Sequence, residues 1–205
     1  MIVIEKPTVL QLPDERAEIS VQFTRDGSEN KLWYSVPSRS AESLVTENAD
    51  AFLLGLLFLG LQTGDDIQVN TPVSAKLFYS VTHYLIPALC LANPKLKPVK
   101  VTAGELNEKD LNTRNVAATG LSCGVDSFAT YYDHIDEQGS YKIEYFTFFN
   151  AGSHGSGGED TRKIFQERLK KSLRFAKGEG KEIIPIDSNL SEILMMKFQE
   201  TNTLR

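Results

Sequence analysis

Short apolar runs alternate with turn-forming residues along the C-terminal half of the chain. Residues 141–149 are rich in β-branched and aromatic side chains, which predicts a strand. Residues 116–121 and 182–187 predict two more strands, and residues 160–177 have apolar positions at helical spacing. Strands that alternate with helices favour a parallel sheet with right-handed crossovers.

The N-terminal half has a different pattern. Residues 18–24 and 31–36 alternate apolar and polar positions on either side of a turn, which predicts a β-hairpin. The elements expected after it are a helix at 51–62, a strand at 66–70, a helix at 72–91 and a strand at 99–102. Residues 104–115 are polar and lack a strong period, so we interpret them as a linker. We therefore expect an α/β fold with two parts, residues 1–110 with the hairpin and residues 111–205.

The turn after residues 116–121 carries the strongest chemical signal. It reads Ser122-Cys-Gly-Val-Asp-Ser127 and joins a buried strand to an apolar helix that opens near residues 127–133. Such a turn directs backbone N–H groups and the positive end of a helix dipole into one space, which suits a phosphate group. Ser122 and Ser127 add hydroxyl donors. The alternative is a plain strand-to-helix turn capped by Asp126 or Ser122.

The six residues resemble the Ser-Gly-Gly-x-Asp-Ser loop of the PP-loop ATP pyrophosphatases, which cleave ATP between its α and β phosphates. Five of the six positions fit, and Cys123 stands where the family usually has its first glycine. Because glycine permits positive φ, either the backbone at Cys123 accommodates an L-residue or the loop has drifted from catalysis. No Gly-Lys-Ser/Thr follows, so the loop is not of the kinase type.

The resemblance implies a Rossmann-like nucleotide part of the HUP type that binds ATP and Mg²⁺. A substrate oxygen would attack the α-phosphate, release pyrophosphate and leave an adenylate for amide ligation or thiolation, with catalysis by positioning and charge neutralisation. The small-molecule acceptor is not identified. The expected nucleotide-binding residues are Ser122, Cys123, Gly124, Val125, Asp126, Ser127, Asn150 and His154, with Asp126 and Ser127 catalytic and Asp126 a metal ligand.

Ligands collect where parallel strands end, so residues 122–127, 150–158 and 187–189 are expected to share one edge. Gly152-Ser-His154 with Glu159 is loosely similar to the Gly-Gln-x-His and Glu of the 7-cyano-7-deazaguanine synthases. This similarity makes His154 a candidate nucleotide contact, and a solvated loop histidine is the alternative. The basic residues of the following helix are expected to form a solvated face.

Other functional classes stay open. A reductase of the adenylyl-sulfate type looks similar but normally needs a reactive cysteine near its C-terminus, and none follows Cys123. A non-catalytic nucleotide-binding or partner-binding module is the other class. Cys123 is also a candidate sulfur-handling thiol, since some relatives are thiolation enzymes and a helix N-terminus lowers a thiol pKa.

Composition and charge limit the class of protein and its expected location in the cell. The net charge of −5 argues against a nucleic-acid-binding protein, and Cys90 and Cys123 suggest neither a disulfide framework nor a zinc site. The start has no signal-peptide pattern, and the apolar run at residues 51–61 is shorter than the about 20 residues that span a bilayer. These features predict a cytoplasmic protein without a membrane segment.

The number of strands bears on activity. PP-loop folds use about five parallel strands, whereas only two further strands are expected after residues 116–121. The resemblance therefore implies an incomplete, perhaps truncated catalyst, which lacks one wall of its crevice unless residues 66–102 or another chain supply it. An exposed apolar sheet edge would then favour a homodimer.

Overall fold

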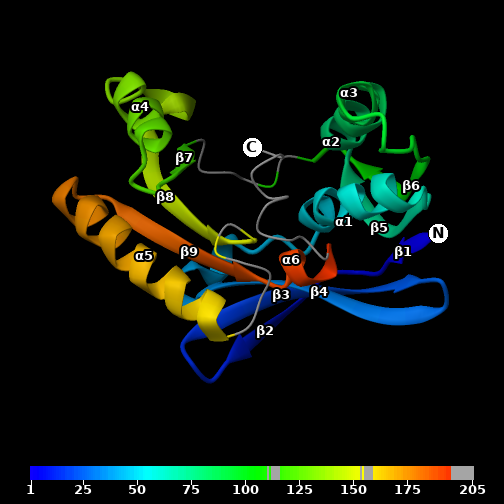
Figure 1. Cartoon of the computed structure of the whole chain (residues 1–205), viewed down its shortest axis with the longest axis horizontal. Helices are drawn as coiled ribbons and strands as arrows, with labels where there is room; N and C mark the ends of the chain where they lie inside the picture. The colour runs from blue at the N-terminus through cyan, green and yellow to red at the C-terminus, as the bar shows by residue number, and fades with distance from the viewer. Residues whose placement is uncertain (110, 112–115, 153, 155–158, 195–205) are drawn as a thin grey trace. The chain divides into compact units, whose positions relative to one another are not determined.

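A computed structural model of the protein describes residues 1–109, 111, 116–152, 154 and 159–194 (Figure 1). Its fold is α/β, with nine strands in a mixed sheet, flanking helices and an antiparallel hairpin near the N-terminus, which confirms the expected fold class. The chain forms two compact units. The first unit contains Met1–Pro13, Ala17–Trp33 and Glu42–Lys109, and the second contains Asp14–Arg16, Tyr34–Ala41 and residues 110–205.

The first unit is built on β1, which pairs antiparallel with β3 and parallel with β5. Parallel pairing continues from β5 to β6. The predicted hairpin is confirmed as β3 and β4, which contribute residues to both units. The strands are β1 (Ile2–Ile4), β2 (Thr8–Leu12), β3 (Arg16–Arg25), β4 (Ser28–Pro37), β5 (Ile67–Ser74) and β6 (Val101–Asn107).

The helix α1 (Asp50–Thr63) is apolar nearly all round, and half of its residues are buried, on more than one side of the helix, as that pattern predicts. It ends at Gly64, whose left-handed backbone (φ 81°) lets its N–H donate to the Gly60 carbonyl. The other helical segments that begin before residue 100 are η1 (Ser38–Ser43), α2 (Ala75–Ser80), the π-helical η2 (Val81–Leu85) and α3 (Ile86–Ala92).

Two predicted boundaries in this unit are wrong. The helix expected from residue 72 starts at Ala75, because β5 continues past a register shift and pairs Pro72 with Glu105. The same pairing takes residues 104–107, expected in a polar linker, into β6. The remaining linker residues 110 and 112–115 lie outside the described ones.

By length and composition, one helical stretch of the described residues, Ala75–Ala92, is long and apolar enough to cross a bilayer. Core helices of soluble proteins pass the same test. The observation therefore neither supports nor contradicts the expected absence of a membrane segment.

The second unit contains the three strands predicted in the C-terminal half, β7 (Ala117–Gly120), β8 (Ile143–Asn150) and β9 (Glu182–Ser188), in the order β9-β8-β7. Both pairings are parallel, as predicted. On its other side β9 pairs antiparallel with β4 through Tyr34 and Ser35, so it is not an edge strand. The helical segments of this unit are α4 (Val125–Asp133), η3 (Gly139–Tyr141), α5 (Glu159–Gly178) and α6 (Leu190–Ile193).

The core of the second unit lies on one face of β8. Phe146 is fully buried there and contacts the rings of Tyr131 from α4 and Phe175 from α5. Both crossover helices therefore pack on the same face of the three strands, and the Phe128 ring of α4 lies 4.9 Å from the Phe175 ring of α5. Within the described residues β7 pairs with β8 alone, so β7 is an edge strand.

Candidate functional site

The turn between β7 and α4 leaves the start of the helix open. Its N-cap residue is Gly124, with φ −94° and ψ 169°, and no side chain caps the helix. Capping by Asp126 or Ser122 is therefore wrong. Among the described residues, no acceptor receives the N–H groups of Val125, Asp126 and Ser127. These donors and the positive end of the helix dipole are available to an anion.

The two serines of the turn differ in their surroundings. Ser122 is exposed, whereas the Ser127 hydroxyl donates to the Gly124 carbonyl at 2.9 Å. The hydroxyl hydrogen of Ser127 is thus engaged within the turn, and its oxygen lone pairs remain as acceptors. Donation from Ser127 to a phosphate requires rotation of this hydroxyl away from Gly124.

Cys123 adopts the left-handed conformation that the family glycine would adopt freely, with φ 58°. This conformation costs an L-residue about 1–2 kcal/mol. The turn is held in place by α5, because the Ser172 hydroxyl donates to the Leu121 carbonyl at 2.8 Å. The Cys123 sulfur lies 3.7 Å from the same hydroxyl and is a free thiol. The cysteine therefore keeps the glycine-type backbone of the loop and contacts α5.

A cavity of about 800 Å³ adjoins the turn. It brings together five of the predicted site residues, Ser122, Cys123, Asp126, Ser127 and His154. Gly124 and Val125 are not among its lining residues, and the Val125 side chain is exposed. Any contact of these two residues with a ligand would thus come from the backbone. The other lining residues are Gly120, Leu121, Thr130, Thr147, Phe148, Phe149, Ala151, Arg168 and Lys171.

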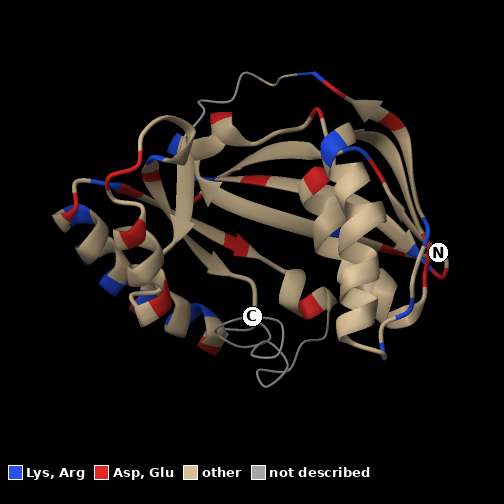
Figure 2. Ribbon diagram, turned by 90° about the horizontal axis from the view of Figure 1, so that it is seen from above, with Lys and Arg blue, Asp and Glu red and all other residues tan. Residues whose placement is uncertain are grey.

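Two basic residues of α5, Arg168 and Lys171, line the same cavity. Both are exposed, as the predicted solvated face of this helix requires, and they border the cavity as well. Figure 2 shows basic and acidic residues along α5, so helical periodicity alone does not single them out. Because the hydrogen bond from Ser172 of α5 to the Leu121 carbonyl, which brings this part of α5 to the turn, joins residues far apart in the sequence, the sequence alone carries no signal for the two basic residues. Their charge suits a polyanionic ligand.

His154 is buried, with 6% of its surface exposed. Its ring lies 5.4 Å from that of Phe148 and 5.5 Å from that of Phe165, in an edge-on arrangement with the latter. The alternative of a solvated loop histidine is therefore wrong. The side chain of Glu159, its expected companion, lies outside the described ones. His154 stands at an aromatic wall of the cavity.

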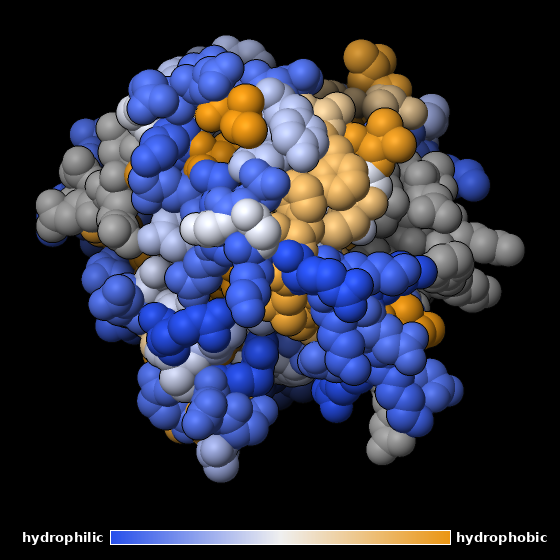
Figure 3. Space-filling view, turned by 90° about the vertical axis from the view of Figure 1, so that its left-hand side faces the viewer, coloured by the Kyte–Doolittle hydropathy of each residue, from blue (hydrophilic) through white to orange (hydrophobic). Residues whose placement is uncertain are grey.

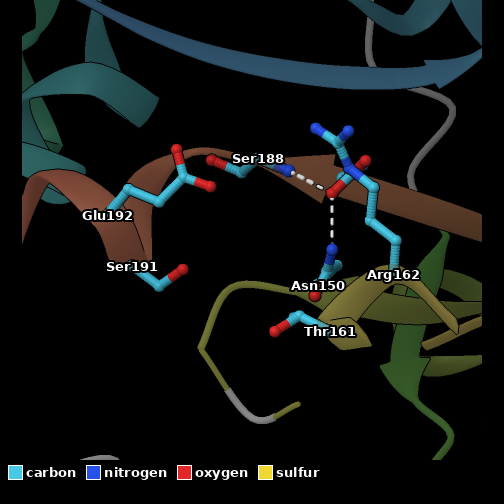
Figure 4. Close-up of a pocket in the computed structure, with 7 residues that line it drawn as sticks. Asn150, Thr161, Arg162, Ser188, Ser191 and Glu192 are labelled. Atoms are coloured by element: carbon cyan, nitrogen blue, oxygen red, sulfur yellow. Dashed lines mark hydrogen bonds between the residues drawn. The ribbon is translucent and has the colours of Figure 1, made fainter. Parts of the chain in front are cut away.

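Asn150 is placed elsewhere. Its Nδ2 donates to Asp187 Oδ1 at 2.7 Å, across the register pair at the ends of β8 and β9. The predicted meeting of these strand ends is thereby confirmed. However, Asn150 lines a second, much smaller cavity with Asp187 (Figure 4), and it does not line the cavity at the turn. The structure does not bring Asn150 together with residues 122–127.

The metal prediction rests on Asp126 alone. No cluster of three or more His, Cys, Asp or Glu side chains occurs in the part of the chain that the structure describes. Asp126 is exposed at the rim of the larger cavity. One carboxylate suits Mg²⁺ that arrives with a nucleotide, since Mg²⁺ commonly takes one or two carboxylates and completes its shell with phosphates and water.

Figure 3 views the side of the molecule on which α4 and α5 lie. Polar side chains dominate this face, and apolar patches lie between them; exposed apolar side chains of the two helices include Val125 and Leu173.

Comparison with known proteins finds no matching protein-family model, no matching curated protein and no matching solved structure. The resemblance to PP-loop enzymes thus rests on the local motif and its surroundings.

Proposed function

We propose that the second unit binds Mg-ATP at residues 122–127 and adenylates a substrate oxygen with release of pyrophosphate. The observation that carries the proposal is one cavity shared by the open start of α4 and two basic side chains of α5. Unpaired N–H donors on one wall and Arg168 and Lys171 on another suit the phosphates of a nucleotide.

Each group has a distinct part in this proposal. The N–H groups of Val125, Asp126 and Ser127 hold one phosphate, and the two basic side chains neutralise the others. Asp126 would otherwise repel a phosphate, so we assign it to Mg²⁺, which screens charge as pyrophosphate leaves. The hydrogen bond from Ser172 to the Leu121 carbonyl joins the turn to α5. It thereby fixes the position of the N–H groups relative to the two basic side chains.

The reaction is an in-line displacement at the α-phosphorus. A bond forms from the acceptor oxygen to phosphorus, the bond to the bridging oxygen of the β-phosphate breaks, and that oxygen leaves with pyrophosphate. The cavity of about 800 Å³ lies within the range of small-molecule sites, about 300–1,000 Å³. Phe149, which is half exposed at this cavity, adds an aromatic surface for a planar ligand.

Binding without chemistry is the second candidate. It is favoured by β7, which within the described residues has a neighbour on one side only. A site at an edge strand is less enclosed, and poor exclusion of water weakens adenylate chemistry. A nucleotide-binding module would use the same donors as the enzyme and release no pyrophosphate.

Calorimetric titration with Mg-ATP tests the binding step. We expect Lys171→Ala to weaken binding by about 1–3 kcal/mol, the range for one charge-assisted contact, and Arg168→Ala to do the same. Lys170→Ala is the matched control, because Lys170 is an exposed lysine of the same helix that does not line the cavity. Equal affinities for Lys171→Ala, Lys170→Ala and the parent would contradict the phosphate assignment.

Asp126→Ala and Ser127→Ala are each expected to weaken Mg-ATP binding by about 1–3 kcal/mol for the same reason. Unchanged affinity in both variants would remove the nucleotide from this turn. Pyrophosphate detection with candidate acceptors then separates an enzyme from a binding module. Preference for adenylyl sulfate over ATP would instead indicate a protein of the reductase type.

A further inference from the structure

The second cavity lies at the carboxyl ends of β8 and β9 and is about 10 Å³ in volume, which matches one water molecule or one ion (Figure 4). Its walls come from the strand ends, the start of α5 and the segment of α6. None of its lining residues lines the larger cavity at the turn. It is therefore a separate feature of the second unit.

Two polar side chains of this cavity are more than nine-tenths buried and have unpaired atoms. Ser191 is 3% exposed, and among the described residues its hydroxyl has no hydrogen-bond partner. Asn150 is 6% exposed and uses Nδ2 to bind Asp187, which leaves its Oδ1 without a donor in the described part of the chain. Neither oxygen is sealed inside the protein, so an occupant of the cavity can supply the hydrogen-bond or ligand partner that each lacks.

The carboxylates decide what kind of occupant fits. Asp187 is oriented by two donors to its Oδ1, Asn150 Nδ2 at 2.7 Å and the Ser188 N–H at 3.0 Å. Its second oxygen accepts no hydrogen bond from the described residues, and Glu192 supplies another carboxylate to the same cavity. In Figure 4 the Arg162 guanidinium lies away from Ser191 and Glu192. Two carboxylates, an amide oxygen and a hydroxyl form an all-oxygen set of ligands.

We propose that this cavity binds a hard divalent cation, Mg²⁺ or Ca²⁺, through Asn150 Oδ1, Asp187, Ser191 and Glu192. Such ions prefer carboxylate, carbonyl and hydroxyl oxygens over nitrogen or sulfur. The ion would tie the ends of β8 and β9 to α6. The proposal does not depend on nucleotide binding, because its ligands lie outside residues 122–127.

The test is calorimetric titration of the nucleotide-free protein with CaCl₂ and MgCl₂. We expect one ion per chain with a dissociation constant of about 10⁻⁴–10⁻³ M, the range of weak protein calcium sites. Asp187→Asn retains the acceptor for Asn150 and Ser188 but removes the charge, and it should weaken binding at least about tenfold. Ser191→Ala should weaken binding less, and Arg162→Gln should strengthen it by removing a competing positive charge.

Two controls make the result specific. Asp160→Asn removes an almost fully exposed carboxylate one residue before Thr161 and should leave the affinity unchanged. Asp126→Asn should also leave it unchanged, which separates this site from the proposed Mg-ATP site. Crystals soaked in Mn²⁺ should show an anomalous peak between Asn150 and Glu192.

Absence of both heat and a peak at about 10 mM ion, roughly ten times the upper end of the expected range, would overturn the proposal. A peak only elsewhere on the chain would do so as well. Equal affinity of Asp187→Asn, Ser191→Ala and the parent would assign the binding to other residues. Circular dichroism of each variant shows whether a lost signal reflects a lost fold.

Discussion

The two units differ in what happens to polar groups where their parallel strands end. In the first unit β5 ends at Ser74, whose N–H and hydroxyl both donate to the Asp50 carboxylate. The end of β6 is closed as well, since Asn107 donates to Asn48 at 2.8 Å. In the second unit, the N–H groups at the start of α4 and the Ser191 hydroxyl have no partner among the described residues.

The difference distinguishes polar groups that stabilise the fold from polar groups that are available to bind a ligand. A paired buried group contributes to stability and is destabilising when it loses its partner. A group that is left unpaired at a cavity adds nothing to the fold and is worth keeping only if something binds it. The strand ends of the first unit therefore contribute to stability, whereas the end of β7 and the start of α6 in the second unit are better suited to binding.

We expect the largest effect on stability when the hydrogen bonds at the end of β5 are removed. Asp50→Ala removes both acceptors of Ser74, and we expect it to lower the free energy of unfolding by about 2–3 kcal/mol, the range for hydrogen bonds to a charged group. Asp126→Ala, the matched change at the open strand end, should lower it by less than about 1 kcal/mol, because Asp126 contributes only through the helix dipole. Urea denaturation measures both values. Equal losses of unfolding free energy in the two variants would contradict the distinction between the two strand ends.

Buried serines sharpen the same comparison within the second unit. Ser172 is fully buried and donates to the Leu121 carbonyl, so Ser172→Ala should lower the free energy of unfolding by about 1–2 kcal/mol. Ser191 is 3% exposed and its hydroxyl is unpaired among the described residues, so Ser191→Ala should change the free energy of unfolding by less than about 0.5 kcal/mol in the absence of divalent ions. A loss as large in Ser191→Ala as in Ser172→Ala would mean that Ser191 already has a structural partner.

The fold was more predictable than its boundaries. The three strands of the second unit follow from short runs of apolar, β-branched or aromatic residues between turn residues, and α1 follows from an apolar run of helical length. The N-terminal end of α2 could not be placed, since Pro72 and its neighbours are tolerated in a strand beside a register shift. Segment 104–107 is polar in sequence, yet backbone pairing with β5 makes it a strand.

The site was predictable where the motif is local. The strand and the helix that flank the turn follow from residues 116–133, whereas the left-handed backbone at Cys123 could not be predicted, because an L-residue disfavours it. Arg168 and Lys171 were missed because helical periodicity identifies a polar face without showing which of its residues overlie a distant strand end. Asn150 and His154 belong to one loop in sequence but line different cavities.

The two units should also differ in their response to pH. In the first unit, hydrogen bonds from Thr63, the N-terminal amine and Arg25 hold the pKa of Asp65 well below its usual range. A lowered folded-state pKa adds stability that is present above about pH 4 and is lost as pH falls further. In the second unit, burial and then the hydrogen bond to Glu179 raise the pKa of Tyr131 to about 12.

A raised pKa has the opposite sign for pH dependence. The contribution of Tyr131 is present below about pH 10 and is lost as pH rises towards 12. Asp65→Asn should flatten the acid limb of the plot of unfolding free energy against pH and leave the alkaline limb intact. Tyr131→Phe should flatten the alkaline limb alone, and an effect of either variant on the other limb would contradict the assignment.

The smallest effect is expected at Cys123, where the open edge tolerates a strained residue. Cys123→Gly removes a left-handed L-residue, a gain of about 1 kcal/mol that the extra freedom of glycine in the unfolded chain offsets by about 0.5–1 kcal/mol. The net change in unfolding free energy should therefore stay within about 0.5 kcal/mol.

Since the backbone already has the glycine-type conformation, the Cys123→Gly variant should bind Mg-ATP at least as tightly as the parent. Cys123→Ser is the control, because it keeps the left-handed L-residue and removes only the sulfur. A tenfold loss of affinity in both folded variants would show that the thiol itself contacts the ligand, and the loop would then differ from its glycine-containing counterpart in chemistry as well as in sequence.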